Sequence, residues 1–578
     1  MVKELNFMVG GEAGQGVQTI GFVLAKAMTR FGFHVFADQD YESRIRGGHN
    51  FFRIRMSLDP VQAFTEKVDI LIALNQETID LHRNEVREGG AAIFDESRIK
   101  LEGNRINSLK IPLERLAVDT TSNKLMTNSV AIGAAIAAAG YDFDTLARIL
   151  TEHFAGKGLA EPNVTAARAG YDHARRQPGN GLEPPPPPGL ADKRMLLNGN
   201  EALALGAMAA GCKFVAAYPM TPTSSIMEYI TEKGRKYDII TVQPEDEIAA
   251  INMVIGAAFA GVRAMTVTSG SGFALMVEGL GLAGITETPL VAVLGQRPGP
   301  AVGLPTRTEQ GELAFALHAG TGEFPRALLA PVDIEDNFAT AVTAFNLAER
   351  YQTPVIILTD HHLATSYQDV KAFDLSTVKI DRGELLTDEE LGRISDYKRH
   401  RYTDSGISPR AYPGQGRALV VTDSDEHDEA GHLVEDAETR SKMVLKRMKK
   451  LQGLKGEPAP PRLEETPGAQ VTFIGWGSSY GAIKEAVTLL KGEGVKCNMA
   501  HLNQVYPFPA KEVAMALGKT GRSLAVEMNA TAQLARLIRT ETGIEVSGSI
   551  LKFDGRPFSA AHIMSELKKE VAYAPWQR

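Results

Sequence analysis

The sequence KFVAAYPMTP, residues 213–222, decides the fold of the central part of this 578-residue chain. Residues 213–218 form a short apolar run that is typical of a buried parallel strand, and a helical pattern follows it. Ser225 and Glu228 have the spacing of a capping box at the start of that helix. Thr221 is therefore expected on a strand-to-helix turn, where free backbone N–H groups and its own hydroxyl suit a carboxylate. An ordinary, well-capped turn would have the same pattern.

The sequence QPEDE, residues 243–247, opens a second helix that is almost free of charge and is therefore expected to be buried. Acidic residues in a first turn usually complement the helix dipole, which accounts for Glu245 and Asp246. Glu247 lies where the apolar face begins, so its carboxyl group is expected to lose water and to need a specific partner. A basic ring nitrogen of a bound ligand would be such a partner, because a carboxyl group can share a proton with it.

A third element, GLPTR at residues 303–307, lies in a long, proline-rich loop that follows a predicted strand at 289–294. Loops at the carboxyl ends of strands in an α/β sheet line the ligand crevice. Thr221, Thr306 and Arg307 could therefore converge on one anion, with the arginine as a bidentate clamp for a carboxylate. Arg297 lies in the same loop and remains an alternative to Arg307, and a surface position would explain any single arginine.

The three elements together resemble the thiamine-pyrimidine half-site of the 2-oxoacid:ferredoxin oxidoreductases, and the resemblance extends over nearly the whole chain. It implies a multidomain α/β protein with a pyrimidine-type thiamine-diphosphate-binding fold. Pro219 and Glu247 would contact the thiamine, while Thr221, Thr306 and Arg307 would hold the carboxylate of a 2-oxoacid. Residues 422–450 look like the α subunit of these enzymes, although taken alone they would form a charged surface helix.

The amino-terminal part predicts a second βα turn. Residues 5–9 read as a strand, GGEAGQG at 10–16 as a glycine loop, and 17–30 as an amphipathic helix, which together favour a phosphate group. The glycine order satisfies neither the dinucleotide fingerprint nor the P-loop. A nucleotide site stays open as a hypothesis, in which Asp38 would take the place of the ribose-binding acid.

The same loop, with ESRIRGG at residues 42–48, resembles the γ subunit of the oxidoreductase family. In some relatives this domain takes part in coenzyme A binding. The resemblance therefore implies a coenzyme A site in which the two arginines would pair with the phosphates. The implied contacts are Gly14, Gln15, Gly16, Arg44 and Arg46. Ion pairs at the surface or between domains are an equally good explanation of the arginines.

The length fits about three or four domains. A run that includes PPPPP at 184–188 cannot lie inside a helix or sheet and predicts a stiff linker. Residues 374–467 are polar and turn-rich, and we expect them to wrap the surface or to meet a partner. From Val471 an α/β pattern resumes that resembles the carboxyl-terminal domain of transketolase-like enzymes. The predicted domains are a γ domain (1–178), the linker (179–191), the pyrimidine-type domain (192–373), the polar segment (374–467) and the transketolase-like domain (468–578).

Composition indicates a cytoplasmic enzyme. The net charge of −8, with both signs interspersed, gives no reason to expect nucleic-acid binding. The amino terminus lacks a signal-peptide pattern, and the most apolar stretch, 275–294, contains Glu278 and Glu287, which argues against a membrane span. The chain has two cysteines, Cys212 and Cys497, which we expect in the core.

The resemblance also implies partners, because a complete enzyme of this class needs more than this chain provides. Two cysteines cannot hold an iron–sulfur cluster, and the family's Gly-Asp-Gly signature for the diphosphate Mg²⁺ is absent. The Mg²⁺ and a [4Fe-4S] cluster would therefore lie on a β subunit, no metal would bind here, and two αβ pairs would form the enzyme.

The implied reaction is the reversible, coenzyme A-dependent oxidative decarboxylation of a 2-oxoacid with reduction of ferredoxin. The expected substrate is 2-oxoglutarate, with pyruvate or a broad specificity as the alternative. Two other hypotheses remain: a nucleotide-binding oxidoreductase that uses the glycine loop, and an assembly subunit without catalytic function.

Overall fold

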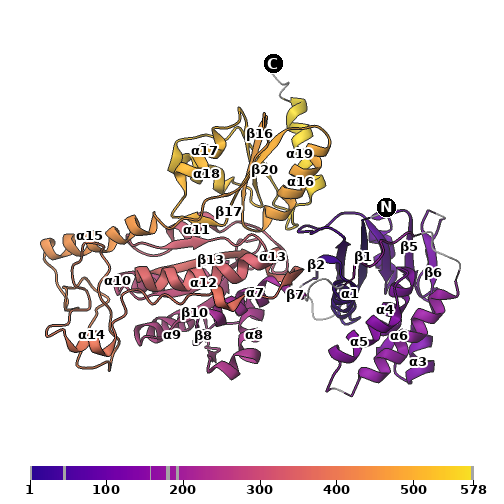
Figure 1. Cartoon of the computed structure of the whole chain (residues 1–578), viewed down its shortest axis with the longest axis horizontal. Helices are drawn as coiled ribbons and strands as arrows, with labels where there is room; N and C mark the ends of the chain where they lie inside the picture. Colours follow the sequence, from indigo (N-terminus) through magenta and orange to yellow (C-terminus); the bar gives the residue numbers. More distant parts are fainter. Residues whose placement is uncertain are drawn as a thin grey trace. The chain divides into compact units, whose positions relative to one another are not determined.

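The computed structural model describes residues 3–42, 47–103, 105–156, 158–177, 182–189 and 194–573. The chain forms two compact units, labelled by element in Figure 1. Unit 1 comprises Met1–Leu197, Thr365–Ala372 and Ser559–His562, and unit 2 comprises Asn198–Ala364, Phe373–Phe558 and Ile563–Arg578. Within the described ranges, no helix has the length and apolar character needed to cross a membrane.

Unit 1 is built on a mixed eight-stranded sheet with the order β6-β5-β4-β1-β3-β2-β14-β7. Strands β1, β4, β5 and β6 are parallel, whereas β3 runs antiparallel to β1 and to β2. The strands are β1 (Glu4–Glu12), β2 (His34–Asp40), β3 (His49–Ser57), β4 (Val68–Ala73), β5 (Val86–Phe94), β6 (Asn107–Lys110), β7 (Arg194–Asn198) and β14 (Tyr367–Lys371).

Helix α1 packs on β1, β2 and β3 of this sheet and buries Ile20, Leu24 and Met28. The predicted order of strand, glycine loop and helix is confirmed, except that Gly10 and Gly11 still belong to the strand. The helices are α1 (Val17–Phe31), α2 (Gln76–His82), α3 (Leu113–Thr121), α4 (Thr127–Ala138), α5 (Phe143–His153) and α6 (Ala160–Arg175). In the predicted linker, the described residues 182–189 form neither helix nor strand.

Unit 2 contains a seven-stranded sheet with the order β18-β12-β13-β11-β10-β8-β9. Neighbours from β12 to β9 are parallel, and only β18 is antiparallel. The strands are β8 (Phe214–Ala216), β9 (Ile240–Val242), β10 (Ala264–Ser269), β11 (Leu290–Gln296), β12 (Ala327–Leu329), β13 (Pro354–Asp360) and β18 (Gln504–Tyr506).

Helices cover both faces of this sheet, which explains why its strands are continuous apolar runs. Alternate residues of a strand join different cores: Val291 and Val293 pack with α7, α8 and α12, whereas Ala292 and Leu294 pack with α9, α10 and α11. The helices are α7 (Gly199–Ala209), α8 (Ser224–Gly234), α9 (Glu247–Phe259), α10 (Gly270–Ile285), α11 (Leu313–His318), α12 (Ile334–Tyr351) and α13 (His361–Thr365).

The carboxyl-terminal part of unit 2 forms a second sheet with the order β15-β17-β16-β19-β20. The α/β pattern predicted from Val471 is confirmed, because β16 begins at that residue and α16, β17 and β19 follow it. The elements are β15 (Arg462–Glu464), β16 (Val471–Trp476), β17 (Cys497–Leu502), β19 (Ser523–Glu527), β20 (Gly548–Leu551), α16 (Tyr480–Gly492), α17 (Ala510–Leu517), α18 (Gln533–Thr542) and α19 (Ala560–Tyr573). Cys212 and Cys497 are both buried and unpaired.

The polar segment contains α14 (Asp388–Gly392) and α15 (Ala437–Leu454) and packs on the rest of unit 2 through buried charges. The interpretation of residues 422–450 as a surface helix is wrong for one face of α15, where Lys446 and Lys450 are 2% and 1% exposed. Both ammonium groups contact Glu287, 2.5 Å away in the case of Lys446. His400 Nδ1 lies 3.2 Å from the same carboxylate. The buried carboxylate of Glu287 therefore pairs with lysine side chains that would otherwise face water.

Two predictions of local structure are also wrong. Ser225 does not cap α8, because the helix begins at Ser224 after Thr223, and the Ser225 hydroxyl accepts a hydrogen bond from Asn200 instead. Helix α9 is not fully buried, since Ile248 and Met253 are 48% and 40% exposed. In the sequence, an exposed apolar helix face, such as one that binds another protein, has the same pattern as a face buried in the core.

Candidate functional site

The turn that carries Thr221 lies at the carboxyl end of β8, beside the start of α10. Strand β8 leads into α8 on one face of the sheet, and its neighbour β10 leads into α10 on the opposite face. The chain therefore leaves the carboxyl ends of these two strands in opposite directions. Ligands bind in such crevices of α/β sheets. The sulfur of Met220, in the turn, lies 3.9 Å from the Thr268 hydroxyl and 3.6 Å from the Ser271 hydroxyl. The Thr221 turn and the start of α10 therefore flank this crevice.

Glu247 is the first residue of α9 and is only 4% exposed. Asp246 caps the helix by accepting a hydrogen bond from the Ala249 N–H at 2.8 Å, so dipole complementation does not require Glu247. Its buried Oε1 has no hydrogen-bond partner. A buried polar atom without a partner is uncommon in proteins, and a role in binding a ligand would explain it.

Gly272 lets the Glu247 carboxyl group approach the first turn of α10. A Cβ atom on Gly272 would lie 2.5 Å from Oε1 of Glu247 and 2.2 Å from the Thr268 hydroxyl oxygen. These separations are shorter than ordinary Cβ contacts, so a larger residue would displace one or both of these side chains. The second element thus reaches the same crevice as the turn, and Glu247 points its unpaired oxygen toward the start of α10.

Arg297 is the arginine that contacts the Thr221 turn. Its Nη1 donates a hydrogen bond to the Thr221 carbonyl at 2.8 Å, and its buried Nε has no partner. Burial lowers the pKa of this guanidinium, which Glu312 opposes, but it keeps its charge at neutral pH. The unpaired N–H can bind a carboxylate in the crevice.

Arg307 and Thr306 lie further along the same loop. Arg307 Nη1 donates to the carbonyl of Thr306 at 3.1 Å, and Thr306 is 8% exposed. Both arginines influence His361 at the end of β13, whose pKa is lowered to about 3 by burial and by the charges of His362, Arg307 and Arg297. The loop therefore brings two cations close to one buried, neutral imidazole.

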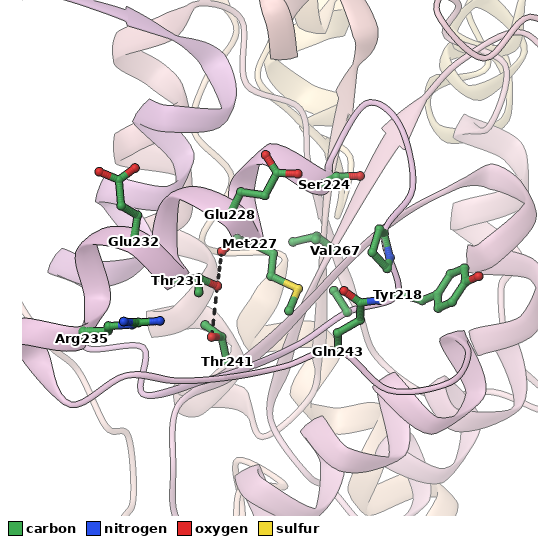
Figure 2. A pocket seen from close by; sticks show the side chains of 12 residues that line it. Tyr218, Ser224, Met227, Glu228, Thr231, Glu232, Arg235, Thr241, Gln243 and Val267 are labelled. Carbon is green, nitrogen blue, oxygen red and sulfur yellow. Dashed lines mark hydrogen bonds between the residues drawn. The ribbon is translucent and has the colours of Figure 1, made fainter. Parts of the chain in front are cut away.

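A pocket of about 640 Å³ adjoins the turn between β8, β9 and α8. Figure 2 shows Tyr218 and Gln243 toward one end and Glu232 and Arg235 toward the other. The hydroxyl groups of Thr231 and Thr241 are hydrogen-bonded to each other at 3.0 Å on its wall. Its lining residues are Ala217, Tyr218, Pro219, Ser224, Met227, Glu228, Thr231, Glu232, Arg235, Thr241, Gln243 and Val267.

The glycine loop of unit 1 borders a smaller pocket of about 280 Å³, which Gly14 and Gln15 line together with Arg98 and Lys124. Gly16 has a φ of 76°, and a Cβ atom there would lie 1.9 Å from the Asn128 amide nitrogen, so glycine is required. The predicted contacts Arg44 and Arg46 lie outside the described residues.

Asp38 does not offer the free carboxylate that the nucleotide hypothesis needs. Arg53 binds it through two hydrogen bonds, Nε to Oδ1 at 3.0 Å and Nη2 to Oδ2 at 2.5 Å. A bidentate, largely buried pair of this kind keeps both carboxylate oxygens occupied. The sequence signal for a ribose-binding acid is thus a structural ion pair between β2 and β3.

Three stretches of the chain match known protein families. Residues 6–173 match the family described as "Pyruvate ferredoxin/flavodoxin oxidoreductase", and residues 205–446 match "Pyruvate flavodoxin/ferredoxin oxidoreductase, thiamine diP-bdg". Residues 469–563 match "Pyruvate:ferredoxin oxidoreductase core domain II".

Whole proteins are similar over nearly the full length. A 2-oxoacid:ferredoxin oxidoreductase subunit alpha from Sulfolobus sp is 34% identical, over 98% of this chain and 97% of the relative. A 2-oxoglutarate oxidoreductase subunit KorA from Mycobacterium tuberculosis is 30% identical, over 97% of this chain and 91% of the relative. The solved 2-oxoglutarate:ferredoxin oxidoreductase from Magnetococcus marinus, with 2-oxoglutarate, coenzyme A and succinyl-CoA bound, has a TM-score of 0.91 at 30% identity, covering 99% and 100% of the two chains.

Proposed function

The chain belongs to the 2-oxoacid:ferredoxin oxidoreductases, a family of thiamine-diphosphate-dependent enzymes, and we propose that it is a γ–α fused subunit acting on 2-oxoglutarate. The mixed α/β, multidomain fold agrees with this membership. We retain the five domains with boundaries at 178, 191, 373 and 467. The matched stretches at 6–173, 205–446 and 469–563 agree with the boundaries at 178, 191 and 467, whereas the proposed boundary at 373 lies inside the second of them.

The observation that carries the proposal is the buried, unpaired Oε1 of Glu247 at the crevice. We propose that Glu247 holds a proton at a ring nitrogen of the thiamine aminopyrimidine, with Pro219 on the wall of the adjoining pocket. When bound, thiamine diphosphate supplies the carbanion and the electron sink that decarboxylation needs. Burial excludes water from Glu247, so solvent does not compete with the ring nitrogen for its carboxyl group.

For the carboxylate of the 2-oxoacid we propose the Thr221 turn and an arginine of the 297–307 loop. Arg297 is favoured over Arg307 because it already contacts the turn and has an unpaired buried N–H. Arg307 and Thr306 remain candidates for a second carboxylate, since Arg307 lies close enough to influence the same histidine. Two cations suit a dicarboxylic acid such as 2-oxoglutarate better than pyruvate.

For coenzyme A we propose the glycine loop of unit 1, with Gly14, Gln15 and Gly16 as contacts. Backbone N–H groups before a helix attract phosphate. Arg98 and Lys124 line the same pocket, where both pair with Glu114. Arg44 and Arg46 remain proposed phosphate contacts.

A partner subunit is part of the proposal, because two buried cysteines cannot hold a cluster. We propose a β subunit that carries the thiamine Mg²⁺ site and a [4Fe-4S] cluster, an (αβ)₂ enzyme, and ferredoxin as electron acceptor. A cytoplasmic location fits the two free thiols, because disulfides form in oxidising compartments.

The proposal is tested by co-expressing the chain with its partner and assaying ferredoxin reduction without oxygen. We expect coenzyme A-dependent turnover with 2-oxoglutarate and little with pyruvate. Equal rates would support the broad-specificity alternative. Turnover of neither acid, with an intact complex, would refute the proposal and favour an assembly subunit. The chain purified alone should be colourless and inactive, and a stoichiometric brown chromophore in it would refute the placement of the cluster.

A further inference from the structure

Four buried polar atoms without partners gather around the first turn of α10. They are Oε1 of Glu247, the hydroxyl of Ser269, Nε of Arg297 and Oε2 of Glu312. Glu247 and Arg297 have been assigned above, and Ser269 immediately precedes the helix. Glu312 has no role so far, although it is a carboxyl group in a place where charge is expensive. It lies just before α11, and the surrounding sequence gives no sign that it belongs to a binding site.

Two contacts place Glu312 at the carboxylate site. Its backbone N–H donates to Oε1 of Gln296 at 3.1 Å, and Gln296 is the neighbour of Arg297. Its own Oε1 rests on Gly270, where a Cβ atom would lie 2.3 Å away. The two glycines of the GSG sequence at 270–272 thus make room for two carboxyl groups, Glu312 on Gly270 and Glu247 on Gly272.

The surroundings keep Glu312 protonated at neutral pH. Burial and the charge of Glu309 raise its pKa to about 8, and Arg297 opposes them. Among the described residues, the other elements beside it carry no charge at this point. The first turn of α10 is Gly-Ser-Gly, and Gln533 of α18, which contacts the adjoining Gly311 and Ala314, is neutral. Glu312 therefore presents a hydrogen-bond donor, rather than a negative charge, beside Arg297.

We propose that Glu312 is a substrate-binding residue, which donates a hydrogen bond from its neutral carboxyl group to the same 2-oxoacid carboxylate that Arg297 binds. The inference rests on the proposed function and assigns a further residue to that site. A substrate carboxylate between the two side chains would satisfy both Oε2 of Glu312 and Nε of Arg297. A neutral donor adds to the clamp without cancelling the charge of the arginine, as an ionised acid would.

The consequence is a substrate affinity that falls as pH rises. Below about pH 8 Glu312 is neutral and donates. Above that pH it ionises, repels the substrate carboxylate and attracts Arg297. The KM for the 2-oxoacid should therefore rise above about pH 8, whereas the KM for coenzyme A should not follow it.

The experiment uses the complex of the full chain with its partner and measures kcat and KM for 2-oxoglutarate over a pH range of about 6.5 to 9.5. Glu312→Gln keeps an amide donor and cannot ionise, so its KM near pH 7 should stay within about twofold of the original and the rise at high pH should disappear. Glu312→Ala loses the donor, so its KM should rise roughly 10- to 100-fold with kcat little changed, the scale of one hydrogen bond to a charged group.

Glu309→Gln is the matched control. Removing the Glu309 charge lowers the pKa of Glu312, so the rise in KM should move to lower pH while the KM at acidic pH stays the same. A Glu312→Gln complex that keeps the original pH profile would overturn the inference, whether or not the alanine variant folds. A Glu312→Ala effect that falls equally on kcat and on the KM for coenzyme A would do so as well. If the unmodified complex turns over no 2-oxoacid, the proposed function itself has failed.

Discussion

Gly272→Ala should disable the enzyme by moving one carboxyl group, while the fold survives. The added Cβ would lie 2.2 Å from the Thr268 hydroxyl and 2.5 Å from Oε1 of Glu247, so one or both side chains must move by about 1 Å to reach ordinary contact. Overpacking of this size costs about 1–3 kcal/mol of folding free energy. A displacement of about 1 Å at a reacting group costs about 100-fold in rate.

The assay compares the variant complex with the unmodified one by thermal unfolding and by ferredoxin reduction with saturating substrates. Gly256→Ala is the control, because Gly256 lies on the neighbouring helix α9 with no atom within 4 Å of an added Cβ. It should leave activity unchanged and stabilise the helix by about 0.5–1 kcal/mol. A Gly272→Ala complex with full activity would show that the Glu247 carboxyl group does not need its observed position.

Further predictions concern the arginines and the buried charges. Arg297→Ala should raise the KM for 2-oxoglutarate by a factor equivalent to about 1.5–3 kcal/mol, and a larger effect of Arg307→Ala would reverse the assignment within the loop. Although burial favours the neutral acid, Lys446 and Lys450 hold the pKa of Glu287 well below its usual value of 4.5. The ion cluster should therefore stabilise the fold above about pH 4.5, and this stability should be lost as the pH falls through the lower folded-state pKa. Glu287→Gln should lower the free energy of unfolding at pH 7 by about 3–5 kcal/mol, and an unchanged melting temperature would contradict this.

Local sequence patterns predicted most of the elements that form the crevice. Apolar runs identified β8 and β11, and the glycine loop identified the turn between β1 and α1, because these signals depend on neighbouring residues alone. Strand-to-helix turns at the carboxyl ends of parallel strands were sufficient to bring Thr221 and the arginine loop together.

Signals that depend on distant residues were missed. The capping box at Ser225 failed because Asn200, 25 positions earlier, binds that hydroxyl. Lys446 and Lys450 looked solvated because their partner, Glu287, lies about 160 residues away. Arg297 and Arg307 could not be ranked, since only the structure shows which one reaches the Thr221 carbonyl. The sequence did not single out Glu312 for the same reason, because the residues that contact it, Gly270 and Gln296, are distant in sequence.

The central claim, that Glu247 holds the proton on which the bound cofactor depends, is tested most directly by exchange of the thiamine C2 proton in the assembled complex. In Glu247→Gln the amide cannot pass on a proton, and exchange should slow by about 100-fold or more, the scale of a lost acid–base group. Glu245→Gln, which removes an exposed acid two residues earlier, should leave the rate unchanged. Normal exchange in the Glu247→Gln complex, or equal slowing in both variants, would contradict the account.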